Sequence, residues 1–262
     1  MKIFWAFTRQ AFQYASVYRF NFFVGILLTF LQMYGIYWVW RTLYTQKPDA
    51  FGVNMEQMIT YGVLGMAMQI FMWSRVQWYI ANQVKSGAID TDLMKPLDFH
   101  IHMLARSTGE TVISSVLALP SLIISYFILG ISLPADIGTA VAFIVSVVLG
   151  FLVIFHLNFI LGTLAVFTLD IRHISWAYMS TVRFFGGQLV PLWLFPPALL
   201  LIANILPFQS TFAIPMSIYI GKLTGADMFR ALGFQFGWMV VLVLGSRLLW
   251  TQAHRRLVVQ GG

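Results

Sequence analysis

Long apolar segments separated by short polar ones make up most of this chain. Runs rich in Leu, Ile, Phe and Val cover approximately residues 20–44, 57–78, 111–131, 137–169 and 230–250. Each run reaches about twenty residues, the length at which an α-helix crosses a hydrocarbon core of about 30 Å. The runs do not alternate with period two, which disfavours a transmembrane β-barrel. The pattern therefore predicts membrane-spanning helices.

A further apolar segment begins at about Trp176 and is interrupted by prolines, namely Pro191, Pro196, Pro197, Pro207 and Pro215. A proline removes a backbone donor and clashes with the preceding turn, so a straight helix cannot carry them. Non-helical backbone at membrane depth has to be satisfied by protein or water. We therefore predict a fifth span followed by a broken or re-entrant hairpin over residues 192–219, near the outer surface. The predicted fold is all-α, with six transmembrane helices in a single transmembrane domain over residues 1–262.

Apolar and polar residues segregate on a helical wheel over residues 1–18. One face carries Phe4, Phe7, Ala11, Tyr14, Ala15 and Tyr18, and the opposite face carries Lys2, Arg9, Gln13 and Ser16. A helix with this segregation lies in the membrane interface. The segment lacks the apolar core and cleavage site of a signal peptide, so we expect it to be retained.

Charged residues are few, and their distribution predicts the orientation of the chain. The chain is 59% hydrophobic and 10% charged, whereas soluble domains are roughly a quarter charged. If the termini and the long polar stretch 80–110 are cytosolic, twelve Lys and Arg lie inside and four lie outside, namely Arg41, Lys47, Lys222 and Arg230. We expect a multi-pass protein of the bacterial inner membrane, and the positive-inside rule predicts that both its termini are cytosolic. We assign the net charge of +7 to loops near lipid headgroups and expect no nucleic-acid partner.

The sequence contains few groups capable of covalent chemistry. Cys is absent, which excludes disulfides, thiolate metal sites and cysteine nucleophiles. No G-x-x-x-x-G-K-[ST] loop occurs, so we do not expect the chain to bind ATP in that way. His156 and Asp170 would lie about 21 Å apart on one helix, too far to share a metal or a proton. We predict no catalytic residue and no metal site, and we keep His156 and Asn158, within the predicted fourth span, as candidates for helix packing or the transport pathway.

Two further patterns leave alternatives open. Gly233 and Gly237 form a G-x-x-x-G pattern in the last span, which permits close approach of a helix from the same chain or from a second subunit. A group of aromatic and Met residues either lines a path for an amphiphilic cargo or faces lipid and core. These residues are Phe71, Met72, Trp73, Trp176, Phe184 and Phe185.

Two motifs carry a family resemblance. Within residues 80–97, a glycine and an apolar residue precede a Leu-x-x-Pro-apolar pattern, and the residues concerned are Gly87, Ile89, Leu93, Met94, Pro96 and Leu97. A second motif covers residues 187–192 and continues with Phe195-Pro196, Leu206-Pro207-Phe208 and Pro215. In order and spacing, these motifs resemble the cytosolic loop and the external hairpin of the ABC-2 type permeases that work with separate ATPase chains. The resemblance covers nearly the whole chain.

This resemblance implies a coupling role for the polar stretch 80–110. Residues 1–18 would be the interfacial connecting helix, and the stretch would contain a coupling helix that binds an ATPase. Four charged residues would make polar contacts that position the helix on the ATPase, namely Lys85, Asp90, Asp92 and Lys95. Four apolar residues would fill a groove of the ATPase, namely Ile89, Leu93, Met94 and Leu97. The alternative is a solvated loop, although apolar residues at helical spacing favour docking. The family also implies two ATPase subunits and two permease chains, identical or related, with ATP and Mg on the ATPase and no cofactor bound by this chain.

We therefore expect the membrane subunit of an ATP-driven exporter, which forms the substrate pathway with a second permease. An ion-coupled carrier would carry acids in mid-span, whereas Glu110, Asp136 and Asp170 lie near predicted span ends. An intramembrane enzyme would show His, Asp, Glu or Ser clustered at one depth, and the sequence gives no sign of such a cluster. The cargo stays open among drugs, lipids, peptides and polysaccharides.

Overall fold

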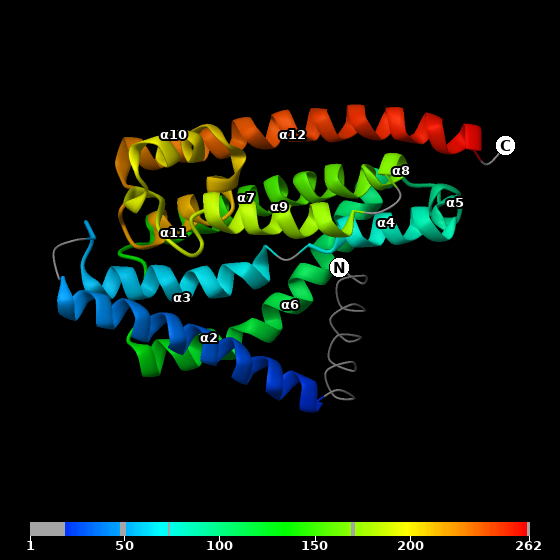
Figure 1. Ribbon diagram of the computed structural model, residues 1–262. Coiled ribbons are helices and arrows are strands. Elements are labelled where there is room, and N and C mark those ends of the chain that lie inside the picture. The colour runs from blue at the N-terminus through cyan, green and yellow to red at the C-terminus, as the bar shows by residue number, and fades with distance from the viewer. Residues whose placement is uncertain (1–18, 48–50, 73, 169–170, 261–262) are drawn as a thin grey trace.

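The computed structural model describes residues 19–47, 51–72, 74–168 and 171–260, and every regular element within these ranges is a helix (Figure 1). The α-helices are α2 (Arg19–Gln46), α3 (Met55–Phe71), α4 (Val76–Ser86), α5 (Ile89–Leu93), α6 (Phe99–Leu129), α7 (Ile137–Thr163), α8 (Ala165–Thr168), α9 (Arg172–Phe185), α10 (Pro197–Ile205), α11 (Ala213–Tyr219) and α12 (Gly225–Gln260). Short 3-10 helices cover Leu192–Leu194 and Pro207–Ser210. The all-α prediction is confirmed for these residues. The interfacial helix predicted over residues 1–18 lies outside them.

Three helices among the described residues are long and apolar enough to cross a membrane. They cover Phe23–Gln46, Ile137–Thr168 and Gly225–Leu257, which correspond to the predicted first, fourth and last spans. Ala118–Leu129, within α6, is a shorter apolar helix in the region of the predicted third span. The structure thus contains several membrane-length helices, and the total of six spans stays a prediction.

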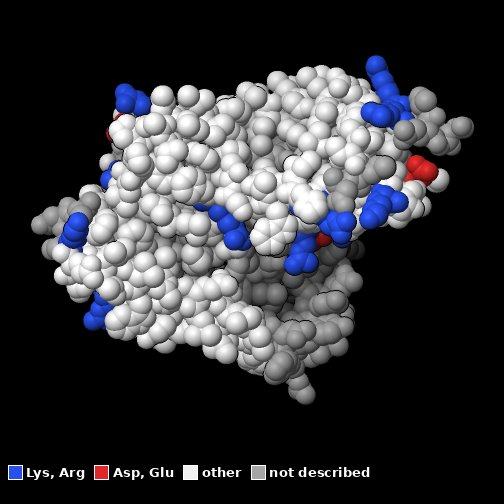
Figure 2. All heavy atoms as spheres, in the orientation of Figure 1, with Lys and Arg blue, Asp and Glu red and all other residues white. Residues whose placement is uncertain are grey.

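The long elements run back and forth between two ends of the molecule (Figure 1). In that view α2, α6 and α9 run towards the end where α10 and α11 lie, whereas α3, α7 and α12 run towards the end where α5 lies. Lys and Arg gather near both ends of the face shown in Figure 2, and a row of them extends from the α5 end along the middle of that face. Much of the remaining surface in this view carries no charge, as lipid-facing surface requires.

The predicted second span is not one helix. A single helix was expected over residues 57–78, but α3 ends at Phe71 and α4 begins at Val76. Ser74 lies between the two helices and accepts hydrogen bonds from α6 and α7. The Asn158 side-chain amide donates to the Ser74 carbonyl at 3.3 Å, and the Ser107 hydroxyl donates to the Ser74 hydroxyl at 2.8 Å. Contacts made from α6 and α7 therefore satisfy polar groups at this helix break.

The proline-rich region forms short helices, as predicted. Pro197 is the first residue of α10, and Pro207 is the first residue of the following 3-10 helix. A proline is tolerated at a first helical position because its missing donor would have no partner in the helix there. The broken character of residues 192–219 is confirmed, and their re-entry into the membrane stays a prediction.

Helix α7 packs against α12, α4, α11 and the 3-10 helix Pro207–Ser210, and glycines on α7 allow close contacts with two of these elements. A Cβ atom added to Gly162 would lie 2.9 Å from the Gln77 Cα on α4. A Cβ atom added to Gly150 would lie 2.5 Å from the Ser210 carbonyl oxygen. Glycines at helix contacts let backbones approach closely, which is how helices associate in lipid.

Candidate functional site

The connection between α4 and α6 is a compact helical corner. Helix α4 ends at Ser86 and is capped by Gly87, whose φ of 73° is in the left-handed region that glycine adopts without strain. The five-residue helix α5 follows. Asp98 then caps α6, because its side chain accepts a hydrogen bond of 3.0 Å from the Ile101 amide. The stretch 80–110 is therefore mostly helical, and it carries one short turn of helix between two longer ones.

One face of this corner is buried inside the protein. Ile89 is 3% exposed and Phe99 is 5% exposed, and Leu93 packs partly buried against the same apolar cluster. The other buried members of the cluster come from α4, α6 and α7, and they are Val76, Ile80, Met103, Phe155 and Phe159. Burial of this face fixes α5 on the helices that follow the α3–α4 break.

The buried side chain of Asp92 stabilises the corner through hydrogen bonds. Its side chain is 2% exposed, and its carboxylate accepts hydrogen bonds from the Tyr79 hydroxyl at 2.7 Å, the Gln83 amide at 3.0 Å and the Lys95 ammonium at 2.7 Å. Burial alone would raise the pKa of this carboxyl, but the bonds from Lys95, Tyr79 and Gln83 outweigh burial and lower the pKa to about 2. Asp92 is therefore ionised at neutral pH and ties α4 to α5.

Tyr79 also connects this corner to α6. The Arg106 guanidinium lies 4.0 Å from the centre of the Tyr79 ring, and it pairs with Glu110 at 3.1 Å. A cation over an aromatic face is attracted by the negative charge of that face. The three consecutive helices α4, α5 and α6 are thus held in one arrangement.

The opposite face of the corner is exposed and partly apolar. Met94 is 79% exposed and Leu97 is 61% exposed. The predicted coupling residues that share their exposure are Lys85, Gly87, Asp90, Lys95 and Pro96. In Figure 1, α5 lies at one extreme end of the molecule, the end at which α12 also finishes. We call Lys85, Asp90, Met94, Lys95 and Leu97 the tip surface.

The ten residues predicted for coupling thus have two different environments. The sequence-based hypothesis placed Ile89 and Leu93 in a groove of the ATPase and gave Asp92 polar contacts with the same partner. In the structure, these three residues contact this chain's own residues. Sequence reasoning missed Tyr79 and Gln83, which bond Asp92. Their spacing of four residues on α4 puts both on one helix face, but only the structure shows the carboxylate that faces them.

His156 belongs to a buried polar cluster. Its Nδ1 lies 3.2 Å from the Ser246 hydroxyl of α12, and the His100 Nε2 lies 3.0 Å from the same hydroxyl. The two imidazole rings stack at 4.9 Å. His100 lies in the stretch predicted to be cytosolic, so its pairing with His156 could not be predicted from the sequence. The cluster joins α6, α7 and α12, which is the packing role considered for His156.

Asn158 supports the α3–α4 break through its bond to the Ser74 carbonyl, whereas its own side-chain oxygen has no hydrogen-bond partner within the described ranges. Within the described residues, no group of three or more His, Asp or Glu could hold a metal ion. Asp170, considered and rejected above as a partner for His156, lies outside the described residues. Trp73, from the aromatic group, also lies outside them.

Gly233 and Gly237 lie on an exposed part of α12. A Cβ atom added to either glycine would meet nothing within 4 Å in the described part of the chain. Neither glycine therefore brings another helix of the described residues into close contact, and the choice between the two alternatives stays a prediction. The surface beside them is apolar, since Phe229 is 68% exposed and Phe236 is 56% exposed.

Most of this sequence matches a known family of membrane transport proteins. The family model for the ABC-2 family transporter protein matches residues 30–261, which include the helical corner, the proline-rich region and the G-x-x-x-G pattern. No curated protein sequence matches the chain. The match covers most of the chain and agrees with the motifs at residues 80–97 and 187–192. The chain therefore belongs to the ABC-2 transporter family and is a membrane permease component of an ABC transporter.

Proposed function

We propose that this permease forms an export pathway with a second permease chain and that separate ATPase subunits bind its tip surface. ATP and Mg would be held by the ATPases, two per transporter. The chain would lie in a bacterial inner membrane with its termini and the tip surface in the cytosol, as the distribution of Lys and Arg predicts.

The observation that carries the proposal is the exposure of Met94 and Leu97 on a corner that is otherwise firmly packed. Exposed apolar side chains at the end of a membrane protein, surrounded by Lys85, Asp90 and Lys95, are typical of an interface with an apolar centre and a polar rim. ATP-driven motion of a soluble subunit reaches the membrane helices only through a stiff element. The bonds of Asp92 and the burial of Ile89 make α5 such an element.

The test is co-purification of the tagged chain from its native host, compared with Met94→Asp and Leu97→Asp variants. A charge forced into an apolar groove is strongly unfavourable. We expect a soluble protein with an ATP-binding loop to accompany the wild type in stoichiometric amount and to be reduced at least about tenfold in both variants. Leu93→Asp is a poor test because Leu93 packs against the core and its change would also disturb folding.

The matched control is Leu133→Asp, an equally exposed apolar position at 65% in the connection between α6 and α7. It should retain the ATPase. Retention of the ATPase by both tip variants would refute the coupling assignment. A stable wild-type assembly without any ATPase would instead favour an ion-coupled carrier.

A further inference from the structure

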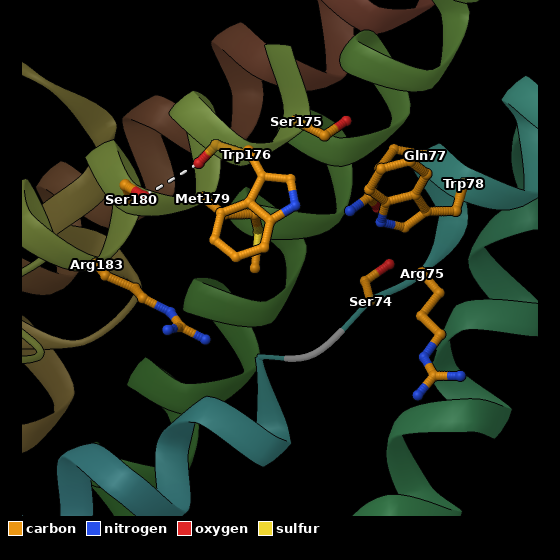
Figure 3. Close-up of a pocket in the computed structure, with 9 residues that line it drawn as sticks. All are labelled: Ser74, Arg75, Gln77, Trp78, Ser175, Trp176, Met179, Ser180 and Arg183. Atoms are coloured by element: carbon orange, nitrogen blue, oxygen red, sulfur yellow. Dashed lines mark hydrogen bonds between the residues drawn. The ribbon is translucent and has the colours of Figure 1, made fainter. Parts of the chain in front are cut away.

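A hollow lies between the α3–α4 break and helix α9 (Figure 3). Its volume is about 210 Å³, and its two walls come from the break with the start of α4 and from one face of α9. A pocket that encloses a whole drug-sized ligand has a volume of roughly 300–1,000 Å³. The hollow is therefore large enough for a headgroup or a similar fragment and too small for an entire amphiphile.

The hollow combines cationic and aromatic groups from both walls. Arg75 and Trp78 come from the break and α4, and Arg183 and Trp176 come from α9. In Figure 3 the two guanidinium groups extend along one side of the hollow, and the two indoles lie towards the other. Among the described residues that line it, none is Asp or Glu. Guanidinium groups bind phosphate and carboxylate through paired N–H donors, so this lining favours an anion.

Two buried polar atoms beside these groups have no hydrogen-bond partner among the described residues. They are the side-chain oxygen of Gln77, which is 2% exposed, and the hydroxyl of Ser175, which is completely buried. Both residues line the hollow. Buried polar groups are normally paired, and a bound molecule is one way to pair them. The Gln77 oxygen requires a donor, so the expected ligand carries a hydroxyl or N–H group besides its anionic group.

The aromatic rings indicate where the rest of the ligand lies. Trp176 is 76% exposed, so its indole stands at the mouth of the hollow. Indoles favour the boundary between headgroups and hydrocarbon, where one edge is polar and the face is apolar. An apolar tail leaving the hollow would therefore pass over the Trp176 ring into the membrane.

We propose that this hollow binds the headgroup of an anionic amphiphile, with its phosphate or carboxylate on the side that carries Arg75 and Arg183 and a hydroxyl of the headgroup bonded near Gln77 and Ser175. The same chemistry describes a membrane lipid with a glycerol headgroup and an amphiphilic cargo. The proposal concerns binding by this chain alone and does not depend on the ATPase.

The first experiment measures the affinity of the purified full-length chain, in neutral detergent, for a short-chain phosphatidylglycerol that carries a fluorophore on its acyl chain. The same label on phosphatidylcholine provides the zwitterionic comparison. We expect the anionic probe to bind at least about tenfold more tightly, and Arg75→Gln and Arg183→Gln each to remove most of that preference. Arg255→Gln, an exposed cation on the tail of α12, should leave it unchanged.

Folding of the variants is checked by gel filtration and by the thermal unfolding midpoint. Trp176→Ala gives an independent variant, because a side chain exposed at the mouth can be removed without disturbing the core. It should weaken the anionic probe severalfold. Equal binding of the two probes by the wild type, or wild-type affinity in both arginine variants, would overturn the proposal.

The source of the ligand is identified by extracting the purified wild type and the Arg75→Gln/Arg183→Gln double variant and comparing their bound small molecules by mass spectrometry. A glycerophospholipid lost in the double variant assigns the hollow to membrane lipid. A different anionic amphiphile lost in the double variant assigns it to cargo. Identical extracts, with no anionic amphiphile lost, would contradict the assignment.

Discussion

Single glycines decide how closely the helices of this permease approach. Gly162 on α7 faces α4, where a Cβ atom would meet the Gln77 Cα at 2.9 Å, the Ile80 Cβ at 3.1 Å and the Gln77 carbonyl oxygen at 3.2 Å. Two of these three atoms belong to backbone, so no side-chain rotation removes the clash. The G-x-x-x-G glycines of α12 have no such neighbours in the described chain. A side chain added at Gly162 would therefore clash with α4, whereas one added to either glycine of α12 would meet no atom of the described chain.

We expect Gly162→Ala to destabilise the protein by about 1–3 kcal/mol, the usual cost of adding atoms to a packed contact. Gly233→Ala is the matched control, since its methyl group enters open space and alanine favours helix by about 0.5–1 kcal/mol over glycine. The measurement is the thermal unfolding midpoint of each purified variant in the same detergent. Equal midpoints for wild type and Gly162→Ala would show that α4 and α7 are not in tight contact.

At the scale of elements, Asp92 is the group that makes the α4–α5–α6 corner stiff. Replacing it by Asn removes the ion pair with Lys95 and weakens two hydrogen bonds, which should cost about 1–3 kcal/mol at neutral pH. Asp90→Asn is the control, because Asp90 lies on the same short helix and is exposed. The unfolding midpoint should fall for Asp92→Asn and stay nearly unchanged for Asp90→Asn.

The Asp92 contribution should also depend on pH in a defined direction. Its pKa in the folded protein is about 2, below the value of about 3.9 in an unfolded chain. A lowered pKa stabilises the folded state above the unfolded value, and that contribution is lost as pH falls towards the folded value. The difference in midpoint between wild type and Asp92→Asn should therefore be full above about pH 4 and shrink between about pH 4 and 2. A difference that stays constant over this range would argue against an ionised, bonded Asp92.

The sequence predicted some elements well and others poorly, for physical reasons. Helices α2, α7 and α12 are long uninterrupted apolar runs, so hydropathy alone locates them. The α3–α4 break was missed because residues 72–75 contain neither Pro nor Gly. Its polar groups are paired by Asn158 and Ser107, which are distant in sequence. Apolar spacing likewise predicted helical structure with an apolar face in this stretch, but it did not show that Ile89 is buried and Met94 exposed.

The exposed apolar face of α12 is one of the surfaces of the whole molecule that lipid or a partner has to cover. Gly237 lies on this face, and Val241 and Leu244, further along α12, are 57% and 58% exposed. Exposed apolar side chains alone are compatible with lipid. Gly233 and Gly237 would also allow a helix of a second permease, the partner proposed above, to approach α12 closely.

The chain has no native cysteine, so one introduced thiol reports a single position. We expect Gly237→Cys, oxidised in native membranes, to form a disulfide-linked product of twice the chain mass on a non-reducing gel if two identical permeases meet at α12. Disulfide formation requires Cα atoms within about 7 Å, which a helix contact through glycine permits. Ile144→Cys on α7, 60% exposed, controls for random collision and should give little product. No product from Gly237→Cys, with a different permease co-purifying, would indicate a pair of related chains. Equal yields from the two positions would show that the α12 face contacts lipid and that the second permease binds elsewhere.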